Sequence, residues 1–175
     1  MKNVNIKTTT KLAALLAVAA FDVRAGEARP EGGSDDRKRI VISIPDRKLV
    51  LMAGDRVLKV YGVAVGKPST PTPQGKFAII NHVPHPTYFG HGVVVAPGKN
   101  NPLGSRWMGL SAKGYGIHGT NEPSSIGKAA SHGCVRMRQS DLEELFELVG
   151  VGTTVELQGE PDAVLARLFS NVVSE

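Results

Sequence analysis

Ser131-His132-Gly133-Cys134 is the stretch on which the interpretation of this chain depends, together with His118 a short distance upstream. Cys134 is the only cysteine in the sequence. A thiol becomes a strong nucleophile when a histidine removes its proton, because the thiolate is the reactive species. Gly133 permits a tight turn and leaves room for a substrate carbonyl beside the amides of Gly133 and Cys134. The stretch therefore predicts a thiol acyl-transfer site in which these two amides form the oxyanion hole.

Two histidines compete for the role of base. His118 lies in the preceding segment, and His132 would share a face with Cys134 if that run were extended. If His118 is the base, we expect it to activate the thiol, so that Cys134 does not keep the resting pKa of about 8.5. The alternative is that Cys134 is a small buried apolar residue without a chemical role.

Four blocks of sequence closely resemble the L,D-transpeptidase (YkuD-like) catalytic domain of bacterial cell walls. They are residues 70–77 (TPTPQGKF), 101–110 (NPLGSRWMGL), 117–121 (IHGTN) and 131–137 (SHGCVRM). The blocks follow the family's order, and the resemblance runs from about residue 39 to residue 157. It implies a mainly β fold, a mixed β-sandwich with the active site in a cleft at one end.

The resemblance also implies roles for individual residues. Cys134 is expected to be the nucleophile and His118 the proton donor and acceptor, with His132 in a supporting role. Some members carry serine where this chain has Gly119, so a backbone carbonyl is expected to orient His118. No separate cofactor is implied.

The implied reaction is an acyl transfer on the stem peptides of peptidoglycan. Cys134 would attack the carbonyl of the third residue of a tetrapeptide stem, meso-diaminopimelate, and the terminal D-alanine would leave. The resulting thioester would pass to an amine of another stem, of a lysine in an outer-membrane lipoprotein, or of a free D-amino acid. Two alternatives stay open: a carboxypeptidase or endopeptidase that uses water at the same site, and a non-catalytic wall-binding module whose thiol is idle.

Three residues are candidates for substrate binding. Arg136 follows Cys134 by two residues, and in a strand it would share that face, where a guanidinium can bind a carboxylate through two hydrogen bonds. The alternative is a solvated arginine on the sheet surface. Trp107 and Tyr115 could wall the cleft or simply pack within the sheet.

A metal site is not expected. His82, His85 and His91 lie among prolines with no second cysteine and no acid nearby, which a closed zinc site would normally need. Surface-loop histidines are the better interpretation.

The N-terminal segment has the pattern of a secretory signal. Lysines at positions 2, 7 and 11 precede an apolar run at 12–21, and Val23-Arg24-Ala25 offers small residues at the cleavage positions. We expect a signal peptide at residues 1–25 and export to the periplasm or cell-wall space. The apolar run is too short to span a bilayer, so no stable membrane span should remain after cleavage. An uncleaved anchor is the alternative.

The remaining chain divides by composition. Residues 26–38 are polar and rich in Gly, Pro, Arg and Asp, which is typical of a disordered linker. The catalytic domain is predicted at residues 39–158, and residues 159–175 form a tail in which 161–169 could make a short helix. In that helix Val164, Leu165, Leu168 and Phe169 would lie on one side.

Charge argues against a nucleic-acid partner. The net charge of the chain is +5, but residues 1–25 contain four Lys/Arg and one Asp. The rest has seventeen basic and fifteen acidic residues, a net +2 that is too balanced for a nucleic-acid footprint. One cysteine cannot form an internal disulfide.

Hydrophobic periodicity predicts mostly β structure. Alternating apolar residues and turn signals predict strands at 40–44, 49–53, 57–65, 76–81, 93–96, 106–110, 115–118 and 153–157, and a short one after Cys134. Residues 82–92 are expected to be irregular. One helix is predicted near 140–149, with Ser140 and Glu143 as a capping box and Gly150 as its end.

Overall fold

Nine strands form one mixed sheet in this computed structural model, which describes residues 37–90, 92–163, 165, 167 and 169. In chain order these strands are β1 (Lys38–Ser43), β2 (Lys48–Ala53), β3 (Arg56–Gly66), β4 (Gly75–Pro84), β7 (Arg106–Leu110), β8 (Gly116–His118), β9 (Ala129–Ser131), β10 (Val135–Met137) and β11 (Thr154–Gln158). Two further strands, β5 (Tyr88–Gly90) and β6 (Val93–Val95), pair only with each other. The helical elements among these residues include the 3-10 turn η1 (Pro123–Ser125) and the helix α1 (Gln139–Leu148).

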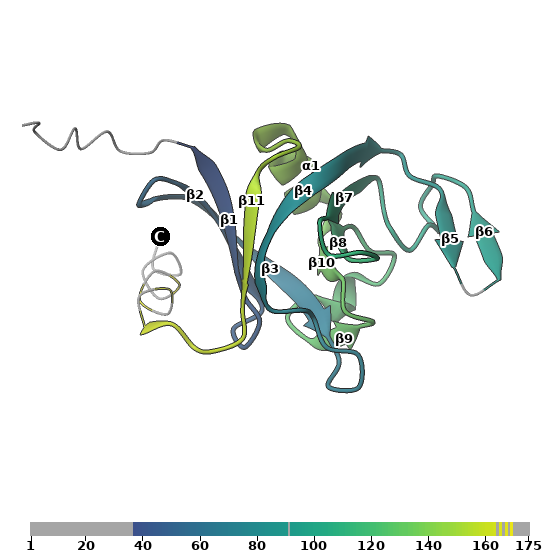
Figure 1. The fold of residues 1–175 in the computed structure, drawn as a ribbon. Coiled ribbons are helices and arrows are strands. Elements are labelled where there is room, and N and C mark those ends of the chain that lie inside the picture. The colour runs from purple at the N-terminus through teal and green to yellow at the C-terminus, as the bar shows by residue number, and fades with distance from the viewer. Residues whose placement is uncertain (1–36, 91, 164, 166, 168, 170–175) are drawn as a thin grey trace, which may run out of the picture. The chain divides into compact units, whose positions relative to one another are not determined.

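The sheet closes on itself, which corrects the expected sandwich. Its strands follow the order β10-β8-β7-β4-β11-β1-β2-β3-β9, and β10 also pairs with β3. That pairing joins the two ends of an eight-strand run into a barrel, and β9 adds to β3 outside the ring (Figure 1). A barrel leaves no edge strands within the ring, whereas a sandwich would leave four. The expected mainly β class and mixed strand directions are confirmed, since β1–β11 and β8–β10 are parallel pairs.

Alternating side chains of the strands fill the barrel. One cluster of buried residues takes Ile40 and Ile42 from β1, Met108 from β7 and Ile117 from β8. The side chains between them in sequence point outward, so the barrel has an apolar inside and a varied outer face.

Helix α1 adds Leu142, Leu145 and Phe146 to the same core. The predicted capping box is wrong. Arg138 is the N-cap and makes no side-chain capping bond, while the Glu143 carboxylate accepts hydrogen bonds from Ser105 and Gln139. A tertiary partner therefore takes the carboxylate that a local cap would use.

Two other local expectations also differ from the structure. Strand β4 continues through Pro84 instead of ending near residue 81, because β7 pairs with its last three residues. The segment predicted to be irregular, 82–92, also holds β5. Its partner β6 lies where a short apolar strand was expected, and in Figure 1 this hairpin stands off the barrel beyond β7 and β8.

The two ends of the chain were predicted in more detail than the structure describes. The expected signal peptide and residues 26–36 of the expected linker lie outside the described residues, and β1 begins at Lys38, one residue before the predicted domain start. In the tail, residues 163, 165, 167 and 169 are helical, and Leu165 and Phe169 are buried against the outer face of β1 and β2. Val164 and Leu168 are outside the described residues.

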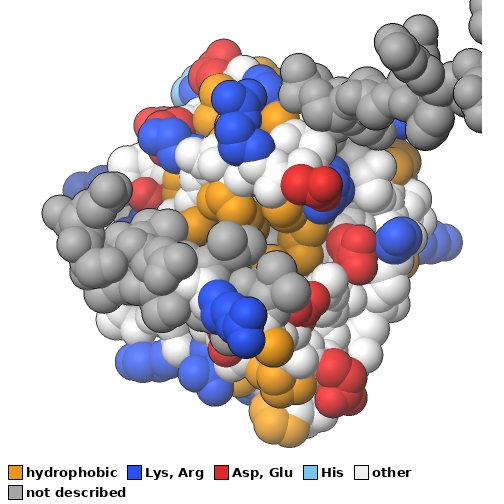
Figure 2. Space-filling view, turned by 90° about the vertical axis from the view of Figure 1, so that its left-hand side faces the viewer, with side chains coloured by type: hydrophobic (Ala, Val, Ile, Leu, Met, Phe, Trp, Pro, Cys, Tyr) orange, Lys and Arg blue, Asp and Glu red, His pale blue; other side chains and the backbone are white. Residues whose placement is uncertain are grey.

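The described surface carries charges of both signs. On the face shown in Figure 2, Lys and Arg side chains are interspersed with Asp and Glu, without one sign dominating. Within the described part of the chain, no helix has the length and apolar character needed to cross a membrane.

Candidate active site

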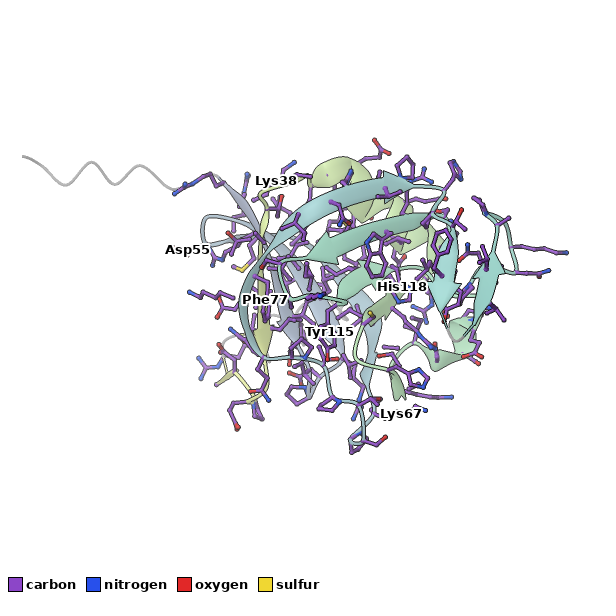
Figure 3. The ribbon with its side chains drawn as sticks, turned by 45° about the vertical axis from the view of Figure 1, so that its right-hand side comes forward. Lys38, Asp55, Lys67, Phe77, Tyr115 and His118 are labelled. Carbon is purple, nitrogen blue, oxygen red and sulfur yellow. The ribbon has the colours of Figure 1, made fainter. Side chains whose placement is uncertain are left out.

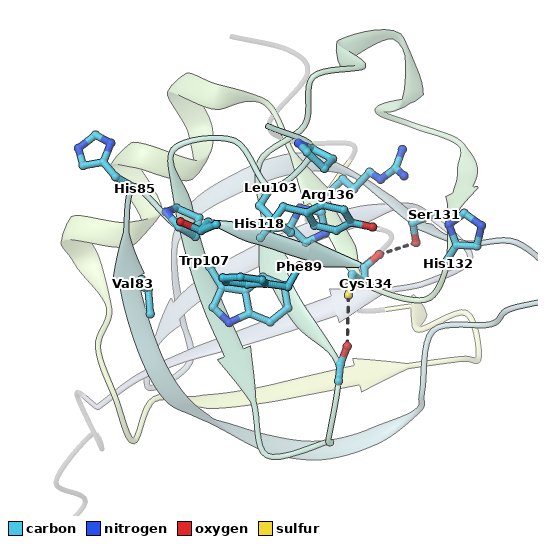
Figure 4. Close-up of a pocket in the computed structure, with 15 residues that line it drawn as sticks. Val83, His85, Phe89, Leu103, Trp107, His118, Ser131, His132, Cys134 and Arg136 are labelled. Carbon is cyan, nitrogen blue, oxygen red and sulfur yellow. Dashed lines mark hydrogen bonds between the residues drawn. The ribbon is translucent and has the colours of Figure 1, made fainter. Parts of the chain in front are cut away.

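A cavity of about 730 Å³ opens on the outer face of β7, β8 and β10 (Figure 4). Its lining comes from the barrel strands β4, β7, β8 and β10, from residues 85–89, which include part of β5, from the loops at 102–103 and 114, and from the segment 131–134. The lining residues are Val83, His85, Pro86, Thr87, Tyr88, Phe89, Pro102, Leu103, Trp107, Gly114, His118, Ser131, His132, Cys134 and Arg136. Figure 3 shows His118 on the side of the molecule away from Lys38 and Asp55.

Strand register explains why four predicted site residues meet here. His118 on β8 pairs with Trp107 on β7 and with Arg136 on β10. Paired residues of adjacent strands point to the same face, so these three side chains share the outer face. Cys134 precedes Arg136 by two residues and lines the same cavity. Ile117 and Val135, one residue away in each strand, point into the core instead.

The loop that carries the thiol is held by Ser131. The Ser131 hydroxyl donates to the carbonyl of Cys134 at 2.5 Å and accepts from the amide of Gly133 at 3.0 Å. Gly133 has φ +110°, a conformation that side chains disfavour, and a Cβ there would lie 2.6 Å from the Tyr115 ring. The hydroxyl and the glycine together turn the chain so that Cys134 faces the cavity. Sequence reasoning quoted Ser131 in the motif but gave it no role.

A second loop, which contains Lys67 and Thr70, supports this turn through hydrogen bonds. The Ser131 carbonyl accepts hydrogen bonds from the Lys67 amide at 3.1 Å and the Thr70 hydroxyl at 3.2 Å. The Thr/Pro block that begins at residue 70 is therefore a brace for the nucleophile loop. Tyr115 is a brace as well: its ring lies against Gly133, and it is not among the residues that line the cavity.

His118 is oriented by a backbone carbonyl, as the glycine after it led us to expect. Its Nδ1 lies 2.6 Å from the Gly119 carbonyl oxygen, and because a carbonyl only accepts, Nδ1 carries the hydrogen. Nε2 therefore holds the free lone pair of the neutral ring. The pKa of His118 is lowered to about 4, mainly by burial; the Gly119 hydrogen bond opposes this shift, and the nearby Arg136 charge adds a smaller lowering. The ring is neutral at physiological pH.

The Gly119 carbonyl is itself fixed by close backbone packing. The Gly119 amide donates to the Leu103 carbonyl at 2.8 Å, and a Cβ on Gly119 would lie 2.9 Å from the Cα of Gly104. A serine at this position would force the two backbones apart. The block at 101–110 is thus structurally tied to the block that carries His118.

The resting thiol is protonated, contrary to the expectation of an activated thiol. Burial raises the pKa of Cys134, and backbone hydrogen bonding and the Arg136 charge only partly offset this. The sulfur lies 3.7 Å from the carbonyl oxygen of Gly114, which accepts from the S–H (Figure 4). A neutral thiol and a neutral imidazole therefore face the cavity, so the proton has to move during the attack on substrate.

His132 lies apart from the pair. It is exposed, it precedes the turn at Gly133, and it therefore does not continue an extended run with Cys134. Figure 4 shows its ring beyond Ser131, toward the edge of the cavity. The shared-face argument that made His132 a rival base fails, because the positive φ of Gly133 interrupts the strand.

One of the two predicted oxyanion donors is already in use. The Gly133 amide donates to Ser131 within the loop, so it would have to exchange this partner for a substrate oxygen. The Cys134 amide comes just before β10 and next to the sulfur. The assignment of the oxyanion hole to these two amides stays a prediction.

Arg136 lines the cavity and already has a carboxylate partner. Its Nη1 lies 3.2 Å from Oε2 of Glu122, and its side chain is only 17 % exposed against 67 % for Glu122. Trp107 is half-buried, stacks on His118 with ring centroids 5.6 Å apart, and donates from Nε1 to Asn81 at 2.9 Å. The structure thus places Trp107 and Arg136, but not Tyr115, on the cavity wall.

The expectation of surface-loop histidines is wrong for His82, which lies in β4 and is half-buried. His82 stacks on Phe146 with centroids 3.4 Å apart, and its Nε2 lies 3.0 Å from the Phe146 carbonyl. His85 is exposed at the cavity wall, and His91 lies outside the described residues. The described residues contain no group of three or more His, Cys, Asp or Glu side chains that could hold a metal.

The lowered pKa of His118 predicts a loss of stability in acid. In the unfolded chain a histidine has a pKa of about 6.5, so the unfolded chain binds the proton before the folded chain does as the pH falls. The contribution of neutral His118 to the free energy of unfolding is complete above about pH 6.5 and is lost as the pH falls to about 4, a difference of roughly 3 kcal/mol. Denaturant unfolding of wild type and His118→Gln at pH 7.5 and 4.5 measures this, and equal pH dependence in the two proteins would contradict it.

A thiol and an oriented, neutral imidazole that line the same cavity are the groups that a thiol acyl-transfer site requires. The comparisons with known proteins identify the family to which the chain belongs. A family model described as "L,D-transpeptidase catalytic domain" matches residues 37–157. The chain belongs to this L,D-transpeptidase (YkuD) family.

Curated relatives carry the same name. A "Putative L,D-transpeptidase YkuD" of Bacillus licheniformis is 45 % identical over 119 residues, which is 68 % of this chain and 64 % of the relative. The Bacillus subtilis (strain 168) protein of that name is 44 % identical over 118 residues, 67 % of this chain and 64 % of the relative. The chain thus spans just under two thirds of the length of these two relatives.

Solved structures support the fold. The NMR structure of the catalytic domain of an L,D-transpeptidase from Enterococcus faecium is 27 % identical, with a TM-score of 0.59 over 70 % of this chain and 98 % of that one. A structure described as "the Ldtfm-avibactam carbamoyl enzyme" is 28 % identical, with a TM-score of 0.61 over 71 % of this chain and 49 % of that one.

Proposed function

We propose that this chain is an exported peptidoglycan L,D-transpeptidase that works through a thioester on Cys134. The observation that carries the proposal is the placement of Cys134 and His118 on one face of the barrel, at one cavity, in the region that matches the family. Substrates are the peptide stems of peptidoglycan.

The first half of the reaction is acylation. A tetrapeptide stem lies in the cavity with the carbonyl of its third residue, meso-diaminopimelate, beside the sulfur. As the sulfur attacks, His118 Nε2 takes the thiol proton, because Nδ1–H is held by Gly119. The carbon–nitrogen bond to D-alanine breaks, the imidazolium gives its proton to the leaving amine, and a thioester remains.

The second half is transfer. An acceptor amine enters the open cavity and attacks the thioester carbonyl while His118 takes its proton. The carbon–sulfur bond breaks, the proton returns to the sulfur, and a new amide forms. The acceptor is an amine of a second stem, a lipoprotein lysine or a free D-amino acid, and each gives a distinct product. Supporting this scheme, the pKa values keep both groups neutral between turnovers.

The deciding experiment is digestion of purified sacculi with residues 26–175, with and without an added D-amino acid, followed by mass spectrometry of the muropeptides. Transpeptidation gives D-alanine release together with cross-linked or exchanged stems. Tripeptide products alone would show a carboxypeptidase, and cleaved cross-links an endopeptidase. No change in any stem, together with no labelling of Cys134 by avibactam, would leave only the wall-binding alternative.

Arg136 is proposed to bind a substrate carboxylate. Arg136→Lys removes the planar two-bond grip and should cost about 1–3 kcal/mol of transition-state binding, seen as a fall in kcat/KM with little change in Tm. Glu122→Gln is the matched control, since it removes the resting partner of Arg136 but not the guanidinium. It should not raise KM. An equal fall in kcat/KM in both variants would mean that activity depends on the Arg136–Glu122 ion pair and not on binding of a substrate carboxylate by Arg136.

Export is proposed from the N-terminal pattern. The lysines, the short apolar run and Val23-Arg24-Ala25 predict that cleavage leaves Gly26 as the first residue. Intact-mass measurement of the protein collected from the periplasmic or wall fraction checks this. A retained N-terminus in that pool would show an uncleaved anchor instead.

A further inference from the structure

Strand β5 of the β5–β6 hairpin lines part of the cavity, but the hairpin has several exposed apolar side chains. Tyr88 and Phe89 line the cavity, while Phe89 is 73 % exposed and Val94 67 % exposed. The two strands pair only with each other among the described residues. An isolated two-stranded hairpin is marginally stable in water, so its position depends on what anchors its base.

Asn101 joins the two ends of that hairpin. Its side chain is 1 % exposed, and Nδ2 donates to the carbonyls of Pro86 before β5 and of Val95 and Ala96 at the end of β6, at 2.9, 3.1 and 3.2 Å. A cluster of three carbonyls can be satisfied only by a donor, which fixes the amide orientation. A backbone hydrogen bond nearby also anchors the base of the hairpin: the His85 amide donates to the Ser105 carbonyl at 2.8 Å.

The carbonyl oxygen of the Asn101 amide hydrogen-bonds to the turn that contacts the residue after His118. Oδ1 accepts from the Leu103 amide at 2.8 Å, and the Leu103 carbonyl in turn accepts from Gly119, the residue that orients His118. One buried side chain therefore fixes the hairpin on one side and the turn beside His118 on the other. A buried polar group satisfied in this way is costly to disturb.

We propose that Asn101 is a positioning residue for substrate binding: its amide NH₂ holds the β5–β6 hairpin at the cavity. It does not touch the reacting atoms. The proposal rests on the proposed function for its substrate, but its structural part can be measured without any activity.

Asn101→Asp is the sharpest variant, because it keeps the acceptor for Leu103 and removes the donor to the three carbonyls. Asn100→Asp is the matched control, since it places the same charge on the exposed neighbouring residue. Should Asn101→Asp fail to fold, Asn101→Ser replaces it, because a serine hydroxyl is too short to reach both ends of the hairpin.

Hydrogen exchange of the amides in Tyr88–Gly90 and Val93–Val95 gives the activity-independent readout. The Asn101 variant should raise their exchange rates by about tenfold or more, the effect of losing about 1.4 kcal/mol of anchoring, while amides of β1 and β2 stay as in wild type. Unchanged exchange in the hairpin, or the same change in Asn100→Asp, would overturn the proposal.

Kinetics then separates binding from chemistry. With a tetrapeptide stem as donor, KM should rise about tenfold with a smaller change in kcat, and alkylation of Cys134 by iodoacetamide should keep its rate. A fall in kcat at constant KM would overturn the proposal, because Asn101 would then act on His118. Wild type that fails to process the stem refutes the proposed function, while the exchange data still decide the role of Asn101.

Discussion

Cys134→Ala is expected to abolish both stem transfer and labelling by an acylating agent such as avibactam. No other thiol exists in the chain, so nothing else can form the thioester. Alanine leaves the turn intact, because the Ser131 hydrogen bonds reach only the backbone of Cys134 and Gly133. The variant should therefore keep its Tm. Muropeptide analysis after sacculus digestion and intact mass after incubation with avibactam are the two measurements.

Cys134→Ser is the informative companion. It keeps a small nucleophile in place but presents a hydroxyl that a neutral imidazole deprotonates far less readily than a thiol. It should also lose transfer, which would distinguish thiol chemistry from any role of the side chain in packing. Transfer activity retained by Cys134→Ala would show that the thiol-enzyme interpretation is wrong.

His118→Ala is expected to slow thioester formation by about 10²–10⁴-fold, the usual contribution of general acid–base catalysis. The pKa of the resting thiol is raised, so the variant loses the proton acceptor that we propose for the attack. Single-turnover acylation by avibactam, followed by mass, measures this step. His132→Ala is the matched control, since that ring also lines the cavity but lies beyond Ser131.

The pH dependence of thiol alkylation adds a second readout. A neutral thiol beside a neutral imidazole predicts that iodoacetamide reacts slowly at pH 7 and faster as the pH rises past the raised pKa of Cys134. A preformed thiolate–imidazolium pair would instead give a rate that is already high and flat near neutrality. A profile that moves in His132→Ala and not in His118→Ala would mean that His132 is the base.

The chemistry proposed for the site could be predicted from the sequence because each signal there is local. A single cysteine, a histidine at 118 and the glycines beside them are residue types whose reactivity and backbone freedom hold in any fold. Most strands and helix α1 could be placed for the same reason, since periods of 2.0 and 3.6 residues show directly in the sequence.

Register and closure could not be read in this way, because they depend on pairings between segments far apart in the chain. The β3–β10 pairing turned the expected sandwich into a barrel, and the β7–β8–β10 register brought Trp107, His118 and Arg136 to one face. A one-residue slip in either pairing would have sent these side chains into the core.

The electrostatics of the site also came only from the tertiary structure. Burial left the thiol of Cys134 protonated, where the sequence motif led us to expect an activated sulfur. Tyr115 became a support for Gly133 instead of a cavity wall, and Glu143 went to Ser105 instead of a helix cap. Residue type and spacing thus determined which groups are present, and packing decided which atoms face each other and how far each is from water, because desolvation and contact arise only when distant segments meet.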